Sequence, residues 1–291
     1  MKRKPATHQN WFVVAGAALV SMTGTATATE PCDDFGECKA LIEINASDGD
    51  IGFHFLMDGD DLNSARIFDP NGKKVFEDQA KGPLKEQKLT ETFAESAEPL
   101  CWADPEADPE DLEDIVTLEE FLDRWEAGTY TFTGMSDGGE KSAGETPLTY
   151  ELPAAPIEPD FDGTTISWGR AGGSTDAEPR GDLGNCATAA ELDILVGNGV
   201  LPMHPADVDV DAWEAVLEPD VDDGDPVGSL VFRIRVPGGI ATTAVTVPAE
   251  YLASLPDDTP VKIEVGAIGG EDNATFSEED GFCVNEVEGC D

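Results

Sequence analysis

The residues of this sequence best suited to chemistry are carboxylates grouped in short turns. The densest group surrounds Gly224 and consists of Asp220, Asp222, Asp223 and Asp225. Carboxylate oxygens in such a turn are the ligands that Ca²⁺ prefers. The spacing departs from the EF-hand register: with Asp220 counted as position one, Gly224 stands at position five rather than six, and no glutamate stands at position twelve. We therefore expect no cofactor, with Ca²⁺ at these four aspartates as the single exception to test, and a solvated acidic turn as the alternative.

Catalysis by a nucleophile and a base has few residues to draw on. After the first 28 residues only His54 and His204 remain, and the sequence lacks a Gly-x-Ser-x-Gly motif. His54 alternates with Phe53 and Phe55, so it is predicted to lie on a strand's surface face, and His204 is also predicted to be exposed. A glycosidase would need two carboxylates at a set separation, and nothing singles out two among 61 acids. We expect no enzymatic activity.

Six cysteines form an even set: Cys32, Cys38, Cys101, Cys186, Cys283 and Cys290. An even number in an exported chain suggests disulfides, and six cysteines allow 15 pairings. Local pairing of Cys32 with Cys38 and of Cys283 with Cys290 would leave Cys101 for Cys186. There is no C-x-x-C motif, so we do not expect a structural zinc site, which needs four closely spaced ligands.

The first 28 residues are typical of a secretory signal peptide. Lys2–Lys4 form a basic start, residues 11–20 are largely apolar, and Ala26 and Ala28 occupy the positions of a cleavage signal. No later stretch approaches the roughly 20 apolar residues of a spanning helix. We expect cleavage after Ala28, a secreted or periplasmic location, and no membrane insertion once the signal is removed.

Charge narrows the range of partners. The chain has 61 acidic and 17 basic residues, a formal net charge of −44. Nucleic-acid affinity comes largely from lysine and arginine that neutralise phosphates, so a nucleic-acid partner is excluded. Anionic membrane surfaces are disfavoured for the same reason. The expected partner is a protein or a carbohydrate, whose identity the sequence leaves open.

Alternating apolar residues predict strands along most of the chain. The clearest run alternates Phe232, Ile234 and Val236 with two arginines, and this pattern is typical of antiparallel sheets with one buried face. One helix is predicted after the capping box Thr117-x-x-Glu120. The prolines at 153–159 suggest a joint between domains. We expect an all-β fold of two antiparallel β-sandwich domains: residues 29–152, with one short helix, and residues 157–291.

The C-terminal half resembles a fibronectin type III domain. Three segments carry the resemblance: 164–168, which ends in Trp168; 213–217, which begins with Trp213; and 255–267. The resemblance implies a seven-stranded sandwich that serves adhesion or spacing. Val261 stands where that family has a tyrosine, and residues 169–207 form an insertion. The whole chain resembles uncharacterised exported bacterial proteins.

These observations predict an acidic, exported, non-catalytic binding or structural module. Two alternatives stay open. One is a secreted hydrolase or its accessory subunit, which a cleft with two suitably spaced carboxylates would favour. The other is a cation-dependent adhesion module, which convergent carboxylates at 220–225 would favour.

Overall fold

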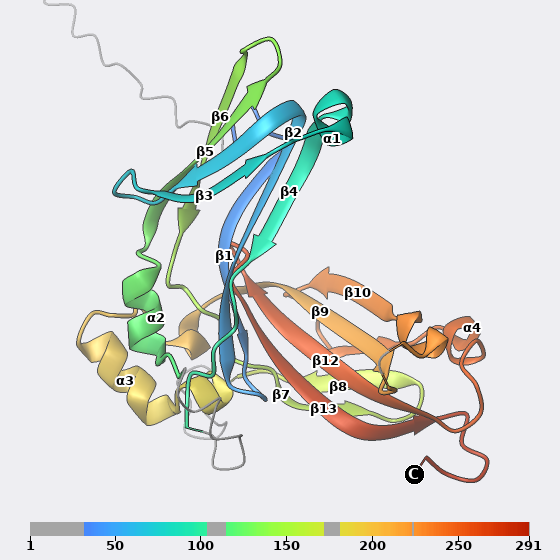
Figure 1. The fold of residues 1–291 in the computed structure, drawn as a ribbon. Coiled ribbons are helices and arrows are strands. Elements are labelled where there is room, and N and C mark those ends of the chain that lie inside the picture. Colours follow the sequence, from blue (N-terminus) through green and yellow to red (C-terminus); the bar gives the residue numbers. More distant parts are fainter. Residues whose placement is uncertain (1–31, 104–114, 172–180, 223, 291) are drawn as a thin grey trace, which may run out of the picture. The chain divides into compact units, whose positions relative to one another are not determined.

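The residues that the structure describes form thirteen strands, which lie in two sheets (Figure 1). The computed structural model describes residues 32–103, 115–171, 181–222 and 224–290. The strands are β1 (Glu37–Asn45), β2 (Asp50–Phe68), β3 (Lys74–Gln79), β4 (Leu89–Glu95), β5 (Gly128–Ser136), β6 (Lys141–Leu148), β7 (Ile157–Phe161), β8 (Thr165–Gly169), β9 (Val210–Pro219), β10 (Phe232–Pro237), β11 (Ala244–Thr246), β12 (Thr259–Gly269) and β13 (Ala274–Val284). The all-β prediction is confirmed. The predicted signal peptide lies outside the described residues.

Short helices connect these strands. They are α1 (Pro83–Gln87), α2 (Leu118–Arg124), α3 (Ala189–Gly197) and α4 (Ala249–Leu252), with 3₁₀ turns η2 (Gly184–Cys186), η3 (Pro205–Asp207) and η4 (Pro226–Ser229). The predicted helix is α2, and both halves of its capping box are formed. Helix α3, which was not among the predicted elements, also begins with a capping box, formed by Thr188 and Glu191. No helix in the described part of the chain is long and apolar enough to cross a membrane.

The larger sheet contains strands from both halves of the chain. It has ten strands, in the order β10-β9-β12-β13-β1-β2-β5-β6, and β3 and β4 also pair with β2. The smaller sheet has the order β11-β8-β7. All the pairs but one are antiparallel: β1 and β13 run parallel, with Glu43 opposite Ala274 and Asn45 opposite Phe276. The first and last strands of the described residues are therefore neighbours.

Two main hydrophobic cores fill the fold. The first is built mainly from the strands before residue 152, with Phe53 and Tyr130 at its centre, and it also takes Leu183, Leu192 and Leu201 from the predicted insertion. The second lies between the two sheets of the C-terminal half, where the Trp168 and Trp213 rings are 5.7 Å apart. The described residues form one compact unit. The division into domains at residues 152–157 stays a prediction.

Three disulfides pair all six cysteines. They join Cys32 to Cys38, Cys101 to Cys186, and Cys283 to Cys290. This is the pairing that local closure at both ends predicts. The middle bond joins the segment after β4 to η2, which belongs to the C-terminal half of the sequence.

Candidate functional site

The turn between β1 and β2, residues 45–50, is where the two halves of the chain meet, and we call it the junction turn. The Asn45 side chain fixes it, because its Oδ1 accepts hydrogen bonds from the N–H groups of Ser47 (3.0 Å) and Asp48 (3.2 Å). Gly49 closes the turn with a φ of 76°, a conformation that favours glycine. The junction turn thus holds its backbone groups in one arrangement for partners on other elements.

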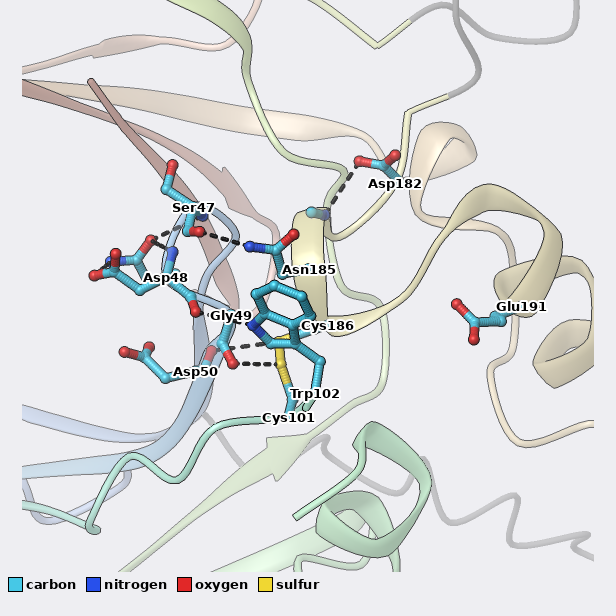
Figure 2. Close-up of a disulfide and its surroundings, with 12 residues drawn as sticks. Ser47, Asp48, Gly49, Asp50, Cys101, Trp102, Asp182, Asn185, Cys186 and Glu191 are labelled. Atoms are coloured by element: carbon cyan, nitrogen blue, oxygen red, sulfur yellow. Dashed lines mark hydrogen bonds between the residues drawn. A yellow bond between two sulfur atoms is a disulfide. The ribbon is translucent and has the colours of Figure 1, made fainter. Parts of the chain in front are cut away.

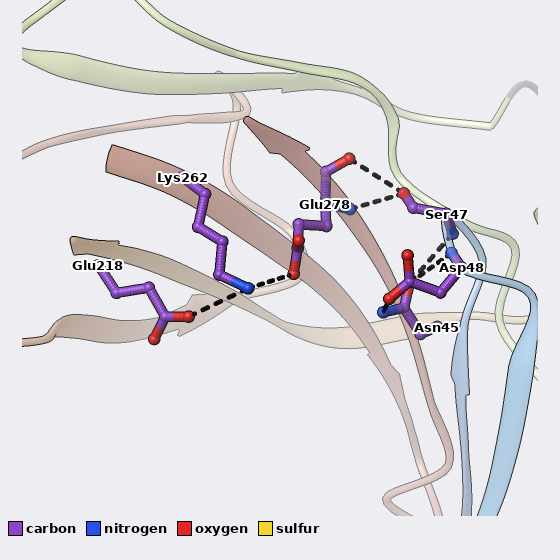
Figure 3. Close-up of polar contacts among 6 residues, drawn as sticks. All are labelled: Asn45, Ser47, Asp48, Glu218, Lys262 and Glu278. Carbon is purple, nitrogen blue, oxygen red and sulfur yellow. Dashed lines mark hydrogen bonds and ion pairs between the residues drawn. The ribbon is translucent and has the colours of Figure 1, made fainter. Parts of the chain in front are cut away.

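One set of partners comes from β13 (Figure 3). The N–H of Ala46 donates to the Phe276 carbonyl at 2.7 Å, which continues the parallel pairing past the end of β1. The Ser47 hydroxyl then donates to the Glu278 carbonyl at 3.0 Å and accepts from the Glu278 N–H at 2.8 Å. The Ser47 side chain therefore makes the two hydrogen bonds to β13 that a paired strand's backbone would otherwise make.

A buried asparagine reinforces the same pair of strands. Asn273 is 1% exposed, and its Oδ1 accepts from the Ile42 N–H at 2.9 Å. Its Nδ2 donates to the Thr149 carbonyl at 3.0 Å. The β1–β13 contact is thus supported at both ends, by Asn273 on one side and Ser47 on the other.

The other set of partners comes from the predicted insertion (Figure 2). The Asn185 N–H donates to the Ala46 carbonyl at 3.0 Å, and its Nδ2 donates to the Ser47 carbonyl at 2.8 Å. A Cβ on Gly184 would lie 2.0 Å from the Ala46 oxygen, so only glycine allows this approach. The adjacent Cys101–Cys186 disulfide fixes the contact covalently.

A second polar group, which we call the His54 cluster, comprises Glu43, His54 and Glu98. Glu43 lies opposite Gly52 on the paired strands, His54 follows two residues later on the same face, and Glu98 lies just after β4. Their ligand atoms all lie within 4.8 Å of one another. His54 Nε2 is 3.4 Å from Glu98 Oε1 but makes no hydrogen bond with any described residue.

Burial and neighbouring carboxylates raise the pKa values of glutamates in and beside the His54 cluster. Burial, followed by repulsion from Glu264, raises the pKa of Glu43 to about 7. Burial and repulsion from Glu278 raise the pKa of Glu264 to about 7 as well. Burial also raises the pKa of Glu98. Beside these groups lies a groove of about 330 Å³, whose lining includes Lys39, Phe93, Arg233 and Arg235.

The histidine predictions are wrong. His54 is 8% exposed and His204 is 2% exposed. The alternation of β2 places His54 opposite the core face as expected, but β4 pairs with β2 and the ring of Phe93 lies 6.0 Å from the imidazole. His204 precedes η3, and its Nδ1 accepts from the Ala206 N–H. Strand alternation alone does not tell whether a neighbouring segment covers the second face.

The predicted Ca²⁺ ligands lie in the segment between β9 and η4. Asp223 is outside the described residues. Asp225 Oδ1 accepts from the Val227 N–H at 2.9 Å and so caps η4. Within the described ranges, Asp220, Asp222 and Asp225 are not among the metal-ligating groups that come within 4.8 Å of one another. Ca²⁺ binding at these aspartates stays a prediction.

No family model matches the chain, and no curated protein matches it. Solved structures that match include a "Biofilm associated protein - BSP domain" (10% identity, 88% of this chain, 30% of that chain, TM-score 0.21). A "tetra-tandem repeat in extending region of large adhesion protein" matches at 12% identity over 85% of this chain and 50% of that chain, with a TM-score of 0.23. A "1.5-MDa bacterial ice-binding adhesin" matches at 12% identity over 85% of this chain and 64% of that chain, with a TM-score of 0.21. This chain therefore spans less than two thirds of each of them, and TM-scores of this size do not establish a common fold.

Proposed function

We propose that this chain is an exported, non-catalytic structural module that withstands pulling force applied between its two ends. The observation that carries the proposal is the parallel pairing of β1 with β13, reinforced by Ser47 and Asn273. The three disulfides support a secreted or periplasmic location. The formal charge of −44 supports a protein or carbohydrate partner over nucleic acid.

The direction of the strands decides how force acts on their hydrogen bonds. Force applied at the N-terminal side pulls β1 towards its start, and force at the C-terminal side pulls β13 towards its end. Because the two strands run parallel, these pulls are opposite and lie along the strands. The cross-strand bonds near Glu43–Asn45 and Ala274–Phe276 are then sheared together, rather than broken one after another.

The terminal disulfides place this force close to the paired strands. Cys38 lies in β1 and is bonded to Cys32, and Cys283 lies in β13 and is bonded to Cys290. Both bonds close short loops outside the overlap of the two strands. Force that arrives at either end therefore reaches the overlap without first extending those loops.

The C-terminal half supports a spacing role. Strands β7, β8 and β11 form the smaller sheet, and β9, β10, β12 and β13 lie at one end of the ten-stranded sheet; both groups surround a core that contains Trp168 and Trp213. A seven-stranded sandwich is the arrangement that the resemblance to fibronectin type III domains implies, and we propose that this half is such a domain with an insertion.

Single-molecule pulling in two directions tests the proposal. Pulling between the two ends shears β1 against β13. Pulling between the N-terminal end and the exposed turn at residues 69–73 instead unzips β1 from β2, because those two antiparallel strands have their open ends side by side. We expect a several-fold higher rupture force end to end. Equal forces in the two directions would contradict the proposal.

A further inference from the structure

The His54 cluster has the donor set of a transition-metal site: one imidazole nitrogen and two carboxylates. We infer that Glu43, His54 and Glu98 bind one divalent first-row transition metal of the Zn²⁺ class. Three sequence segments supply these ligands, from β1, β2 and the segment after β4. The inference does not rest on the proposed mechanical role, because it is argued from side-chain donors, although Glu43 also lies opposite Ala274 in the β1–β13 pairing.

The distances suit such an ion. Two donors bound at about 2.1 Å with a tetrahedral angle between them lie about 3.4 Å apart. His54 Nε2 and Glu98 Oε1 are 3.4 Å apart. The third donor lies on Glu43, within 4.8 Å of both.

His54 itself points to a ligand. The residue is more than nine-tenths buried, and its Nε2 makes no hydrogen bond with any described residue. Its nearest described polar contact is the ion-pair contact with Glu98 Oε1 at 3.4 Å, which is at the long limit for a hydrogen bond, whereas buried polar atoms normally have a closer partner. Because carboxylate oxygens of Glu43 and Glu98 both lie within 4.8 Å of this nitrogen, a bound cation would give all three groups a common partner.

Gly52 keeps the space between the ligands open. A Cβ at this position would lie 2.8 Å from Glu98 Oε1 and 2.9 Å from His54 Nε2. Gly52 is not among the residues with a positive φ, so backbone conformation does not require glycine there. The absent side chain instead leaves room between the two donors.

The donor set favours a transition metal over Ca²⁺. Imidazole nitrogen suits Zn²⁺, Ni²⁺ and similar ions, whereas Ca²⁺ takes six to eight oxygen ligands. Three protein ligands also leave one position for water or for a group from a partner. This arrangement differs from the four-ligand structural zinc site that the sequence argues against.

Titration calorimetry of the metal-stripped full chain with Zn²⁺ tests the inference. We expect one Zn²⁺ per chain, a loss of affinity of at least tenfold in His54→Gln, Glu98→Gln and Gly52→Ala, and no comparable binding of Ca²⁺ at this site. Glu250→Gln, on α4, is the matched control, because it makes the same change as Glu98→Gln outside the cluster, and it should leave Zn²⁺ affinity unchanged. Circular dichroism confirms that each variant is folded.

Imidazole NMR gives a second readout without substitutions. The sequence has three histidines, His8, His54 and His204, so their ring signals can be assigned individually. We expect one equivalent of Zn²⁺ to shift the Nε2 resonance of His54 and leave that of His204 in place. No Zn²⁺ binding, or binding that the His54 and Glu98 variants leave intact, would overturn the inference and make the cluster an ion pair.

Discussion

Single polar side chains at and near the junction turn form hydrogen bonds that join segments far apart in the sequence. Ser47 bonds both backbone groups of Glu278, a residue 231 positions away, and Asn273 bonds the Ile42 N–H across the same separation. The partners of Ser47 cannot be predicted from its neighbours in the sequence, because a serine in an Asn-Ala-Ser-Asp-Gly segment is typical of any turn. The turn itself could be predicted, but its partners could not.

Gly184 gives a prediction at this scale. Gly184→Ala would place a Cβ against the Ala46 carbonyl, in addition to the strain of a φ of 60°. Gly199→Ala is the matched control, because Gly199 has a φ of 76° and open space around it. Urea unfolding should show a loss of about 1–2 kcal/mol for the control, which carries only the left-handed strain. A clearly larger loss is expected for Gly184→Ala, and equal losses would mean that the contact with Ala46 is unimportant.

Glu264 gives a pH prediction. Its folded pKa is about 7, above the ordinary value of 4.5, so the folded state binds more protons than the unfolded state between these values. Stability should therefore fall as the pH rises from about 4.5 to about 7. The charged groups around Glu264 come from four other strands: Glu43 on β1, Glu214 and Glu218 on β9, Arg233 on β10, and Glu278 on β13.

The check is a melting curve for Glu264→Gln at several pH values. This variant cannot ionise at position 264, so its melting temperature should fall less steeply across that pH window than that of the unmodified chain. Glu250→Gln, on α4, is the control for removal of an acid. An unchanged slope in Glu264→Gln would show that this carboxyl does not titrate in the window.

At the scale of elements, short sequence patterns predicted those helices and strands whose formation depends on neighbouring residues. The period-two alternation located several strands, such as β10, and the capping box located α2, because each signal depends on residues close together in the chain. Pairing between β1 and β13 depends instead on contacts across more than 200 residues, and no short pattern encodes them. The burial of His54 was missed for the same reason, since β4 covers it from another part of the sequence.

The Cys101–Cys186 disulfide gives a prediction for these elements. It bridges 85 residues, which cannot extend while the bond is intact. A Cys101→Ser/Cys186→Ser double variant should therefore lengthen the fully pulled chain by about 300 Å, at about 3.5 Å per residue. End-to-end pulling measures this length directly. An unchanged length would mean that these two cysteines are not bonded to each other in the folded protein.

At the scale of the whole molecule, charge is the dominant property. The formal net charge is −44, so the excess carboxylates repel one another when screening by salt is weak. Raising NaCl from about 0.01 M to about 1 M shortens the Debye length from about 30 Å to about 3 Å, so the melting temperature should rise. Calorimetric melting at several salt concentrations checks this, and a melting temperature independent of salt would show that repulsion does not limit stability.

Calcium separates a specific site from general screening. If Asp220, Asp222, Asp223 and Asp225 bind Ca²⁺, millimolar Ca²⁺ should raise the melting temperature beyond the effect of ionic strength, because a ligand of the native state stabilises it by mass action. Asp222→Asn should abolish that excess. The same rise with Mg²⁺ and Ca²⁺, retained in Asp222→Asn, would indicate a solvated acidic turn.

The central claim is that shear between β1 and β13 sets the mechanical strength of this chain. Ser47→Ala removes the two hydrogen bonds that join the junction turn, directly after β1, to β13, whereas Ser229→Ala removes one bond to the Pro226 carbonyl, away from these strands. In end-to-end pulling, the account predicts a lower rupture force for Ser47→Ala and an unchanged force for Ser229→Ala. A Ser47→Ala variant that ruptures at the same force as the unmodified chain would contradict it.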